Sequence, residues 1–183
     1  MTTKIEWTHR PGTTGVTWNP TRGCRRVSPG CGTGTAGGCY AERQAARFSG
    51  PGQPYEGLVE IGKHGPRWTG RGRVVADKLA EPLRWRKPRT VFVDSMSDLF
   101  FEGFAFEQIA AVFGVMAATP QHAYLVLTKR PERARAFFEW ATARCADHRG
   151  CERDTLHRAA VDAIGNGSWE RPFFDQYAEG PLP

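Results

Sequence analysis

A glycine-rich loop that carries three cysteines lies between a β-prone run and a helix-prone run, and it limits what this chain can fold into. The β-prone run is Val16–Trp18, the loop holds Cys24, Cys31 and Cys39, and the helix-prone run begins at Tyr40. Five glycines and a proline lie between the first and the last of these cysteines. Glycine supplies positive φ and close backbone approach, and Pro-Gly favours a turn. The pattern predicts a loop at the end of a strand that brings three thiols together.

Three thiols in one loop indicate metal ligation, because thiolates favour zinc, copper(I) or iron–sulfur clusters. Structural zinc normally takes four protein ligands, and an electron-transfer cluster normally takes four thiolates. Three thiolates leave one coordination position of the metal without a protein ligand, and such an open position is what chemistry at a metal requires. Two alternatives stay open, namely zinc completed by a fourth ligand and three unrelated free thiols. The other cysteines, Cys145 and Cys151, are interpreted as ordinary thiols, although they would complete a zinc site if the fold brought them close.

Two apolar runs that pass directly into polar residues are typical of buried parallel strands. They are Thr90–Ser95 and Ala123–Thr128, and predicted helices follow at Phe106–Ala118 and from Pro131 onward. The repeated order of strand, polar residues and helix predicts parallel β/α units in a barrel or an open α/β sheet, with functional residues at the carboxyl ends of the strands. Asp94, Ser95, Ser97 and Asp98 follow the first of these strands at this edge. The candidates for contact with a ligand are Ser95, Ser97, Asp98, Thr128 and Lys129.

The remaining segments are less regular, and the whole chain of 183 residues is interpreted as one domain. A helix is expected at 40–48, a loop at 50–72, a short strand at 74–75 and a helix at 77–86. Residues 1–140 form the predicted β/α core. Residues 141–183 form a divergent tail, helix-prone to Ile164 and aromatic-rich after it.

The charge is unevenly distributed. Residues 1–90 carry 16 Lys and Arg against 6 Asp and Glu, whereas residues 91–183 carry 9 against 13. A basic half beside a metal loop would attract a phosphate-bearing partner such as nucleic acid. A solvated surface, or a docking face for an acidic electron-donor protein, explains the same asymmetry. No apolar run is long enough to span a bilayer, and the N-terminus lacks an apolar signal region, so a cytoplasmic protein without membrane contact is expected.

Several segments together resemble a phage-associated, radical-SAM-like family with a three-cysteine motif, most of whose members have no known function. The resemblance covers the chain from Lys4 to about Arg135. The segments that carry it are G-C-R-R-V-S-P-G-C (Gly23–Cys31), C-Y-A-E (Cys39–Glu42), V-F-V-D-S-M-S-D-L-F (Val91–Phe100) and L-V-L-T-K-R-P-E-R (Leu125–Arg133), with Trp7, Trp18–Pro20 and Pro120–His122.

The resemblance implies a partial TIM-barrel-like fold and a radical-SAM-type enzyme of unknown reaction. Cys24, Cys31 and Cys39 would hold a 4Fe-4S cluster that cleaves S-adenosylmethionine with an electron from a reduced donor protein. Tyr40 would pack against the cluster or the adenine, and the five residues at the strand ends would contact cosubstrate or substrate. If the chain is phage-encoded, it would act in the host cytoplasm.

The sequence departs from this family at two places. Seven residues separate Cys31 from Cys39, where the family usually has two. The last residues, Gly180–Pro183, resemble those just before a further family strand, so the chain looks C-terminally truncated and a second polypeptide would complete the barrel. The competing interpretations are a zinc-binding, non-enzymatic module that contacts nucleic acid or another partner, and an inactive truncated member of the family.

Overall fold

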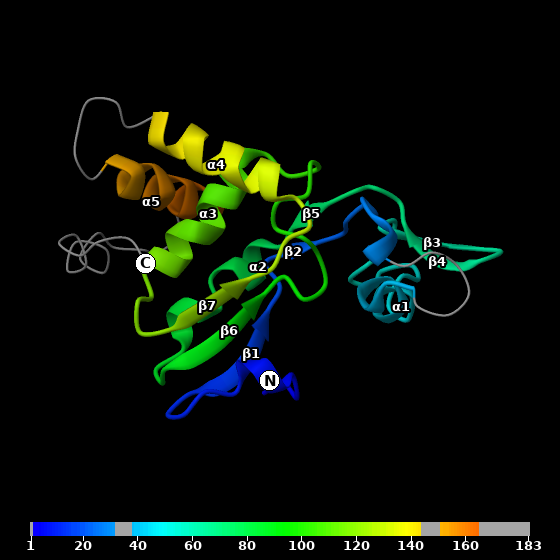
Figure 1. Cartoon of the computed structure of the whole chain (residues 1–183), viewed down its shortest axis with the longest axis horizontal. Coiled ribbons are helices and arrows are strands. Elements are labelled where there is room, and N and C mark those ends of the chain that lie inside the picture. The colour runs from blue at the N-terminus through cyan, green and yellow to red at the C-terminus, as the bar shows by residue number, and fades with distance from the viewer. Residues whose placement is uncertain (1, 32–37, 144–150, 165–183) are drawn as a thin grey trace.

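A three-stranded parallel sheet lies at the centre of the fold (Figure 1). The computed structural model describes residues 2–31, 38–143 and 151–164, which form a mixed α/β structure. The strands are β1 (Thr14–Trp18), β6 (Arg89–Val93) and β7 (Ala123–Val126), in the order β1-β6-β7. Both pairings are parallel. The three carboxyl ends therefore meet at one edge, where the sequence places its polar candidates.

Three helices cover one face of this sheet (Figure 1). They are α3 (Phe106–Ala117), α4 (Pro131–Ala143) and α5 (Cys151–Ile164). Alternate strand residues such as Val16, Trp18, Val91 and Val93 are buried against them in one hydrophobic core. Val and Trp suit this position because branched and aromatic side chains pack well on a pleated surface.

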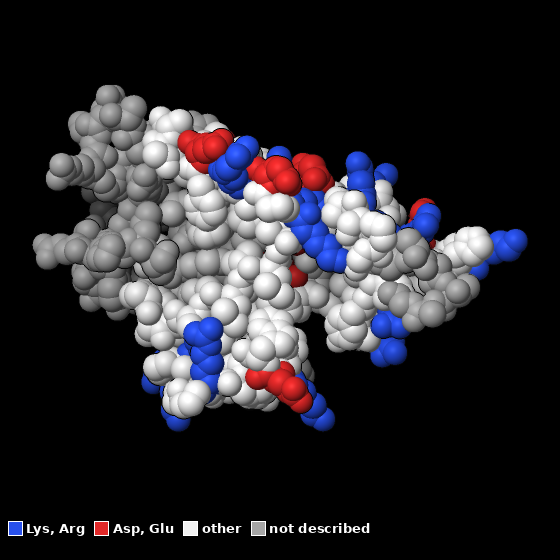
Figure 2. Space-filling model, in the orientation of Figure 1, with Lys and Arg blue, Asp and Glu red and all other residues white. Residues whose placement is uncertain are grey.

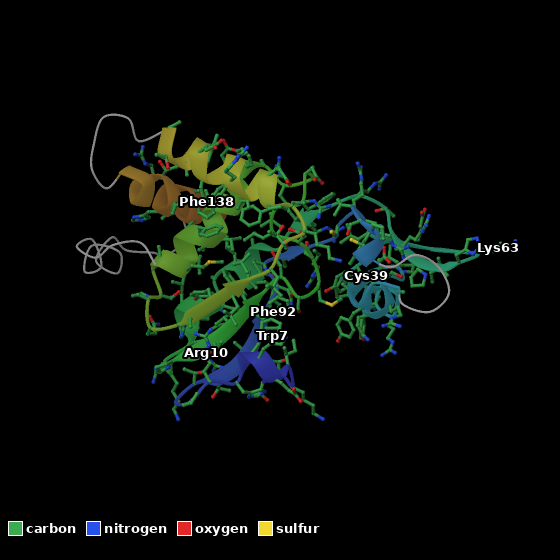
Figure 3. The ribbon with its side chains drawn as sticks, in the orientation of Figure 1. Trp7, Arg10, Cys39, Lys63, Phe92 and Phe138 are labelled. Carbon is green, nitrogen blue, oxygen red and sulfur yellow. The ribbon has the colours of Figure 1, made fainter. Side chains whose placement is uncertain are left out.

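The opposite face of the sheet is covered by a short 3-10 helix, η1 (Glu6–Thr8). The ring of Trp7 packs edge-on against Phe92 of β6, with centroids 4.6 Å apart (Figure 3). Trp7 remains 47% exposed, so this face is far less buried than the helical face.

The sheet is open at β7. In the described ranges this strand pairs only with β6, and the strands form no closed barrel. All four residues of β7 are partly exposed, which is typical of an edge strand.

The helices α3 and α5 approach each other closely at Gly114. A Cβ atom at this position would lie 2.1 Å from the carbonyl oxygen of Leu156 and 2.8 Å from the Cβ of Ala160. The absence of a side chain at Gly114 is therefore what permits this helix–helix contact.

A second group of elements, which we call the cysteine lobe (residues 19–31 and 38–75), extends to one side of the main core (Figure 1). Its last residues join that core, because Val74 packs against it. It contains α1 (Tyr40–Ala46), the hairpin of β3 (Val59–Gly62) and β4 (Gly65–Trp68), and a two-stranded ribbon of β2 (Thr21–Arg22) and β5 (Arg73–Val74). It has its own hydrophobic cluster, formed by Ala41, Ala45, Leu58, Val59 and Trp68, against which Cys24, Cys39 and Met96 pack.

Two parts of the structure differ from the sequence expectation. The stretch at 50–72, expected as a loop, contains the β3–β4 hairpin, in which Ile61 pairs with Pro66. The helix expected at 77–86 is split into α2 (Ala76–Leu79) and the 3-10 helix η3 (Pro82–Arg84), because Pro82 has no N–H to continue the helical hydrogen bonds.

Some expectations fall on residues that are not described, namely Cys145, the side chain of Cys151 and the aromatic segment after Ile164. No helix in the described parts of the chain is both long and apolar enough to cross a bilayer.

Candidate functional site: a cysteine loop at the carboxyl edge of the sheet

The cysteine loop leaves the carboxyl end of β1 and returns into α1, as the sequence predicts. Cys24 follows the ribbon strand β2, Cys31 ends the 3-10 helix η2 (Pro29–Cys31), and Cys39 is the residue before α1. All three are free thiols and are half-buried. Tyr40, the first residue of α1, has 62% of its surface exposed.

The first part of the loop is fixed by side chains at the end of β6. The amide oxygen of Asn19 accepts hydrogen bonds from the Ser95 hydroxyl at 3.1 Å and from the Met96 N–H at 3.0 Å. The Ser97 hydroxyl donates to the carbonyl oxygen of Gly23 at 2.6 Å. Ser95 and Ser97 thus hold the loop in place, and their hydroxyl groups are already engaged within the chain.

Asp94 makes a further connection from the end of β6. Its carboxylate accepts hydrogen bonds from the N–H of Thr21 at 3.2 Å and from the hydroxyl of Thr21 at 2.8 Å. Asp94 has φ +55°, which Asp tolerates better than most residues and which ends the strand. Burial raises the pKa of this carboxyl to about 7, against the lowering effect of the hydrogen bonds from Thr21.

Glycine is required at position 23 by both the backbone conformation and the neighbouring atoms. Its φ is +90°, and a Cβ there would lie 2.2 Å from the carbonyl oxygen of Arg71. A side chain at this position would separate the cysteine loop from the segment before β5.

A buried ion pair between Asp98 and Arg130 links the end of β7 to the loop. The guanidinium donates to Asp98 at 2.9 Å, to Glu102 at 2.9 Å and to the carbonyl oxygen of Arg25 at 2.8 Å. It also lies 3.7 Å from the sulfur of Cys24. The Arg130 side chain is only 5% exposed. Its charge is therefore held beside the first thiol.

The second oxygen and the remaining lone pairs of Asp98 are also engaged. The carboxylate accepts hydrogen bonds from the Thr128 hydroxyl at 2.8 Å and from the N–H groups of Phe100 at 3.0 Å and Lys129 at 3.1 Å. Four donors therefore meet one carboxylate, which fixes the end of β7 relative to the segment after β6.

The environments of Cys24 and Cys31 differ. Burial raises the pKa of Cys24 to about 11, although Arg130 works in the opposite direction. At Cys31 burial also acts to raise the pKa, but hydrogen bonds with the backbone of Val27 and Ser28 and the nearby ammonium of Lys129 outweigh it, so the pKa is lowered. The Lys129 nitrogen lies 3.8 Å from the Cys31 sulfur. Cys31 is thus the thiol that ionises more readily.

A second buried ion pair braces the loop from the side of α1. Glu42, only 1% exposed, contacts Arg26 at 2.6 Å and accepts a hydrogen bond from the N–H of Trp68 at 3.0 Å. This carboxylate ties together the cysteine loop, α1 and the hairpin.

Most of the predicted site residues lie along this edge. The structure brings Cys24, Cys31, Asp98, Thr128 and Lys129 into one connected network. Cys39 packs with Cys24 against the small apolar cluster of the lobe. The sequence places Asp94 at this edge, but sequence reasoning missed the other residues that hold this network together: Asn19, Arg26, Glu42 and Arg130.

The donor set matches thiolate-preferring metals in type, with cations beside two of the three sulfurs. Within the described ranges, however, no group of three or more His, Cys, Asp or Glu side chains is arranged to hold a metal ion.

The fold and the site define an α/β protein with a thiol-bearing loop at the carboxyl edge of a parallel sheet, supported by two buried ion pairs. The sequence profile of the family DUF5131, proteins of unknown function, matches residues 2–164, and the chain belongs to this family. Searches of curated proteins and of solved structures gave no match.

Proposed function

We propose that this chain is a radical-SAM-type iron–sulfur enzyme of phage-associated origin, with Cys24, Cys31 and Cys39 as the ligands of a 4Fe-4S cluster. One observation carries the proposal. The three-thiol loop lies between β1 and α1 at the carboxyl edge of a parallel sheet, where α/β enzymes place their sites. The proposal includes a partial TIM-barrel fold, of which β1, β6 and β7 are neighbouring strands, and a cytoplasmic location.

The chemistry of the donors supports a cluster with one open iron. Three thiolates leave one iron without a protein ligand, whereas electron-transfer clusters normally take four thiolates. Such a cluster, when bound, would supply reductive cleavage of S-adenosylmethionine, with the electron coming from a reduced donor protein.

The residues around the loop have distinct roles in this proposal. Arg130 and Lys129 place positive charge beside Cys24 and Cys31, which offsets the negative charge of bound thiolates. Asp98 acts as a positioning residue, because its carboxylate is used to orient Arg130 and the end of β7. Tyr40 offers an exposed aromatic ring directly after Cys39 for stacking against the cosubstrate.

The open edge of β7 is where further strands of a barrel would pair. In this proposal a second polypeptide, or a segment beyond the described residues, supplies them. Size-exclusion chromatography with light scattering measures whether the chain assembles with a partner.

The decisive experiment is anaerobic reconstitution with iron and sulfide, followed by metal and sulfide analysis and a visible spectrum. We expect about four irons and four sulfides per chain. The cluster should be lost in Cys24→Ala, Cys31→Ala and Cys39→Ala variants. Cys151→Ala is the matched control, because it removes a thiol on α5, outside the loop, and it should retain the cluster.

Other outcomes would redirect the assignment. Stoichiometric zinc without sulfide would overturn the enzyme proposal in favour of a zinc-binding interaction module. A chain without any metal would indicate an inactive member of the family. A positive result leads to an assay of S-adenosylmethionine cleavage with a chemical reductant.

A further inference from the structure

Four arginines meet on the short ribbon beside the cysteine loop. Arg22 of β2 and Arg73 of β5 are direct partners in the antiparallel pairing, and Arg25 and Arg71 flank them. We call these four residues the arginine ribbon. Like charges directly opposite each other destabilise a strand pair. Such an arrangement in a two-residue ribbon calls for a counter-charge.

The chain itself offers little counter-charge to these residues. Arg22 donates to the carbonyl oxygen of Pro54 at 3.1 Å and also lies over the ring of Tyr55, 5.3 Å from its centroid. Arg73 donates to the carbonyl oxygen of Glu56 at 3.4 Å. Among the described residues, no ion pair links the arginine ribbon to a carboxylate.

The arginine ribbon is directly connected to the candidate site. The carbonyl oxygen of Arg71 packs against Gly23, the residue before Cys24. The carbonyl oxygen of Arg25, the residue after Cys24, accepts a hydrogen bond from Arg130 at 2.8 Å. The backbone of the arginine ribbon therefore adjoins the residues on both sides of the first cysteine.

The positive charge continues over the rest of the cysteine lobe. The lobe holds nine Lys and Arg and three Asp and Glu, and Glu42 is already paired with Arg26. Figure 2 shows Lys and Arg side chains standing out from this lobe, whereas over α4 acidic side chains lie next to basic ones. Lys63 extends from the tip of the hairpin (Figure 3). The basic surface of the lobe is therefore larger than the binding of a single phosphate group requires.

Exposed aromatic rings lie among these cations. Tyr40 and Phe48, at the two ends of the α1 region, are 62% and 50% exposed. Proteins that bind single-stranded nucleic acid combine a basic surface that follows the backbone with aromatic rings on which the bases stack. Guanidinium groups also bind phosphate oxygens through two parallel hydrogen bonds.

We propose that the arginine ribbon binds the phosphodiester backbone of a single-stranded nucleic acid and presents it to the cysteine loop. The binding site stands on the ribbon itself. The further statement that this nucleic acid is the substrate rests on the proposed enzymatic function.

Fluorescence anisotropy with a fluorescein-labelled, mixed-sequence 20-nucleotide RNA tests the proposal on the full chain, purified anaerobically. The variant is Arg71→Gln with Arg73→Gln. The matched control is Arg84→Gln with Arg86→Gln, which removes two exposed charges ahead of β6, at the opposite edge of the sheet. Each neutralised phosphate of a single strand contributes about 0.7 to the slope of log affinity against log salt.

The variant Arg71→Gln with Arg73→Gln should therefore have a slope that is less steep by about 1.4, and it should bind the RNA about 25-fold more weakly at 0.1 M salt. The control should bind within about twofold of the unchanged chain, and circular dichroism should show that both variants are folded.

Three results would overturn the proposal: no binding, equal losses in the variant and the control, or competition by mononucleotides as strong as that by the oligonucleotide. Binding does not depend on S-adenosylmethionine cleavage. A chain that assembles a cluster without ribbon-dependent binding therefore refutes only this inference. Ribbon-dependent binding without a cluster refutes only the enzymatic function.

Discussion

Replacing Arg130 by Met should destabilise the protein more than the loss of any surface charge. Methionine keeps much of the length and apolar volume of the side chain but removes the guanidinium. The change leaves the buried carboxylate of Asp98 without its ionic partner and removes the hydrogen bond to the carbonyl oxygen of Arg25. The end of β7 and the cysteine loop would both lose a fixed contact.

The structure sets the size of the effect. Removing one partner of a buried ion pair typically costs about 3 to 5 kcal/mol. Asp98 keeps three hydrogen bonds from Thr128, Phe100 and Lys129, which favours the lower end of that range. Glu102 is 52% exposed, so the loss of its contact adds little. We therefore expect a decrease of about 3 kcal/mol in the free energy of unfolding.

Urea unfolding at pH 7.5, followed by circular dichroism, measures this change. The control is Arg135→Met, which breaks an exposed pair with Glu139 and should cost less than about 0.5 kcal/mol. Adding Asp98→Asn to Arg130→Met should recover a large part of the loss, because position 98 then no longer carries an unpaired buried charge. A loss below about 1 kcal/mol for Arg130→Met, or no recovery in the double variant, would refute the reasoning.

Three further predictions follow from the same structure. Because burial raises the pKa of Asp94 to about 7, the folded state retains a proton that the unfolded chain releases near pH 4. The free energy of unfolding should therefore decrease as the pH rises from about 4 to 7, by at most about 1.4 kcal/mol per pH unit. Urea titrations of Asp94→Asn should show a flatter dependence of this free energy on pH. In the metal-free chain at pH 7.5, iodoacetamide should label Cys31 before Cys24 when followed by mass spectrometry, and equal rates would contradict the assigned electrostatics. Gly114→Ala should lower the free energy of unfolding by about 1 to 2 kcal/mol, because the cost of overpacking against α5 exceeds the gain in helix propensity. In the control Gly50→Ala the added methyl group meets only ordinary contacts, so the free energy of unfolding should change by less than about 0.5 kcal/mol. Thermal unfolding measures both changes.

The strands and helices of the core were accessible from the sequence because each apolar run passes directly into polar residues. The segment at 90–95 overlaps β6 and the segment at 123–128 contains β7, and the predicted helices at 106–118 and from 131 correspond to α3 and α4. The hairpin at 59–68 was missed because Gly and Pro dominate its surroundings. Pro66 is tolerated there because this two-stranded hairpin has free edges.

The polar edge of the sheet was predicted, but its internal connections were not. Thr128 and Lys129 were named as candidates, whereas Arg130 is the more buried residue. The signal was available, because alternation beyond β7 turns Thr128 inward, Lys129 outward and Arg130 inward again. The partners of Asp94 and Glu42 could not be predicted, since each depends on a contact between segments far apart in the chain.

The anchors of the cysteine loop also set when it can take shape during synthesis. Thr21 and Asp94 are 73 residues apart, and Arg25 and Arg130 are 105 apart. A nascent chain that has exposed Cys24 must therefore be extended by about a hundred residues before its supports exist. At about 5 to 20 residues per second, this interval lasts about 5 to 20 s. During that time the thiols are accessible to oxidants and metal ions in the compartment where the protein is made.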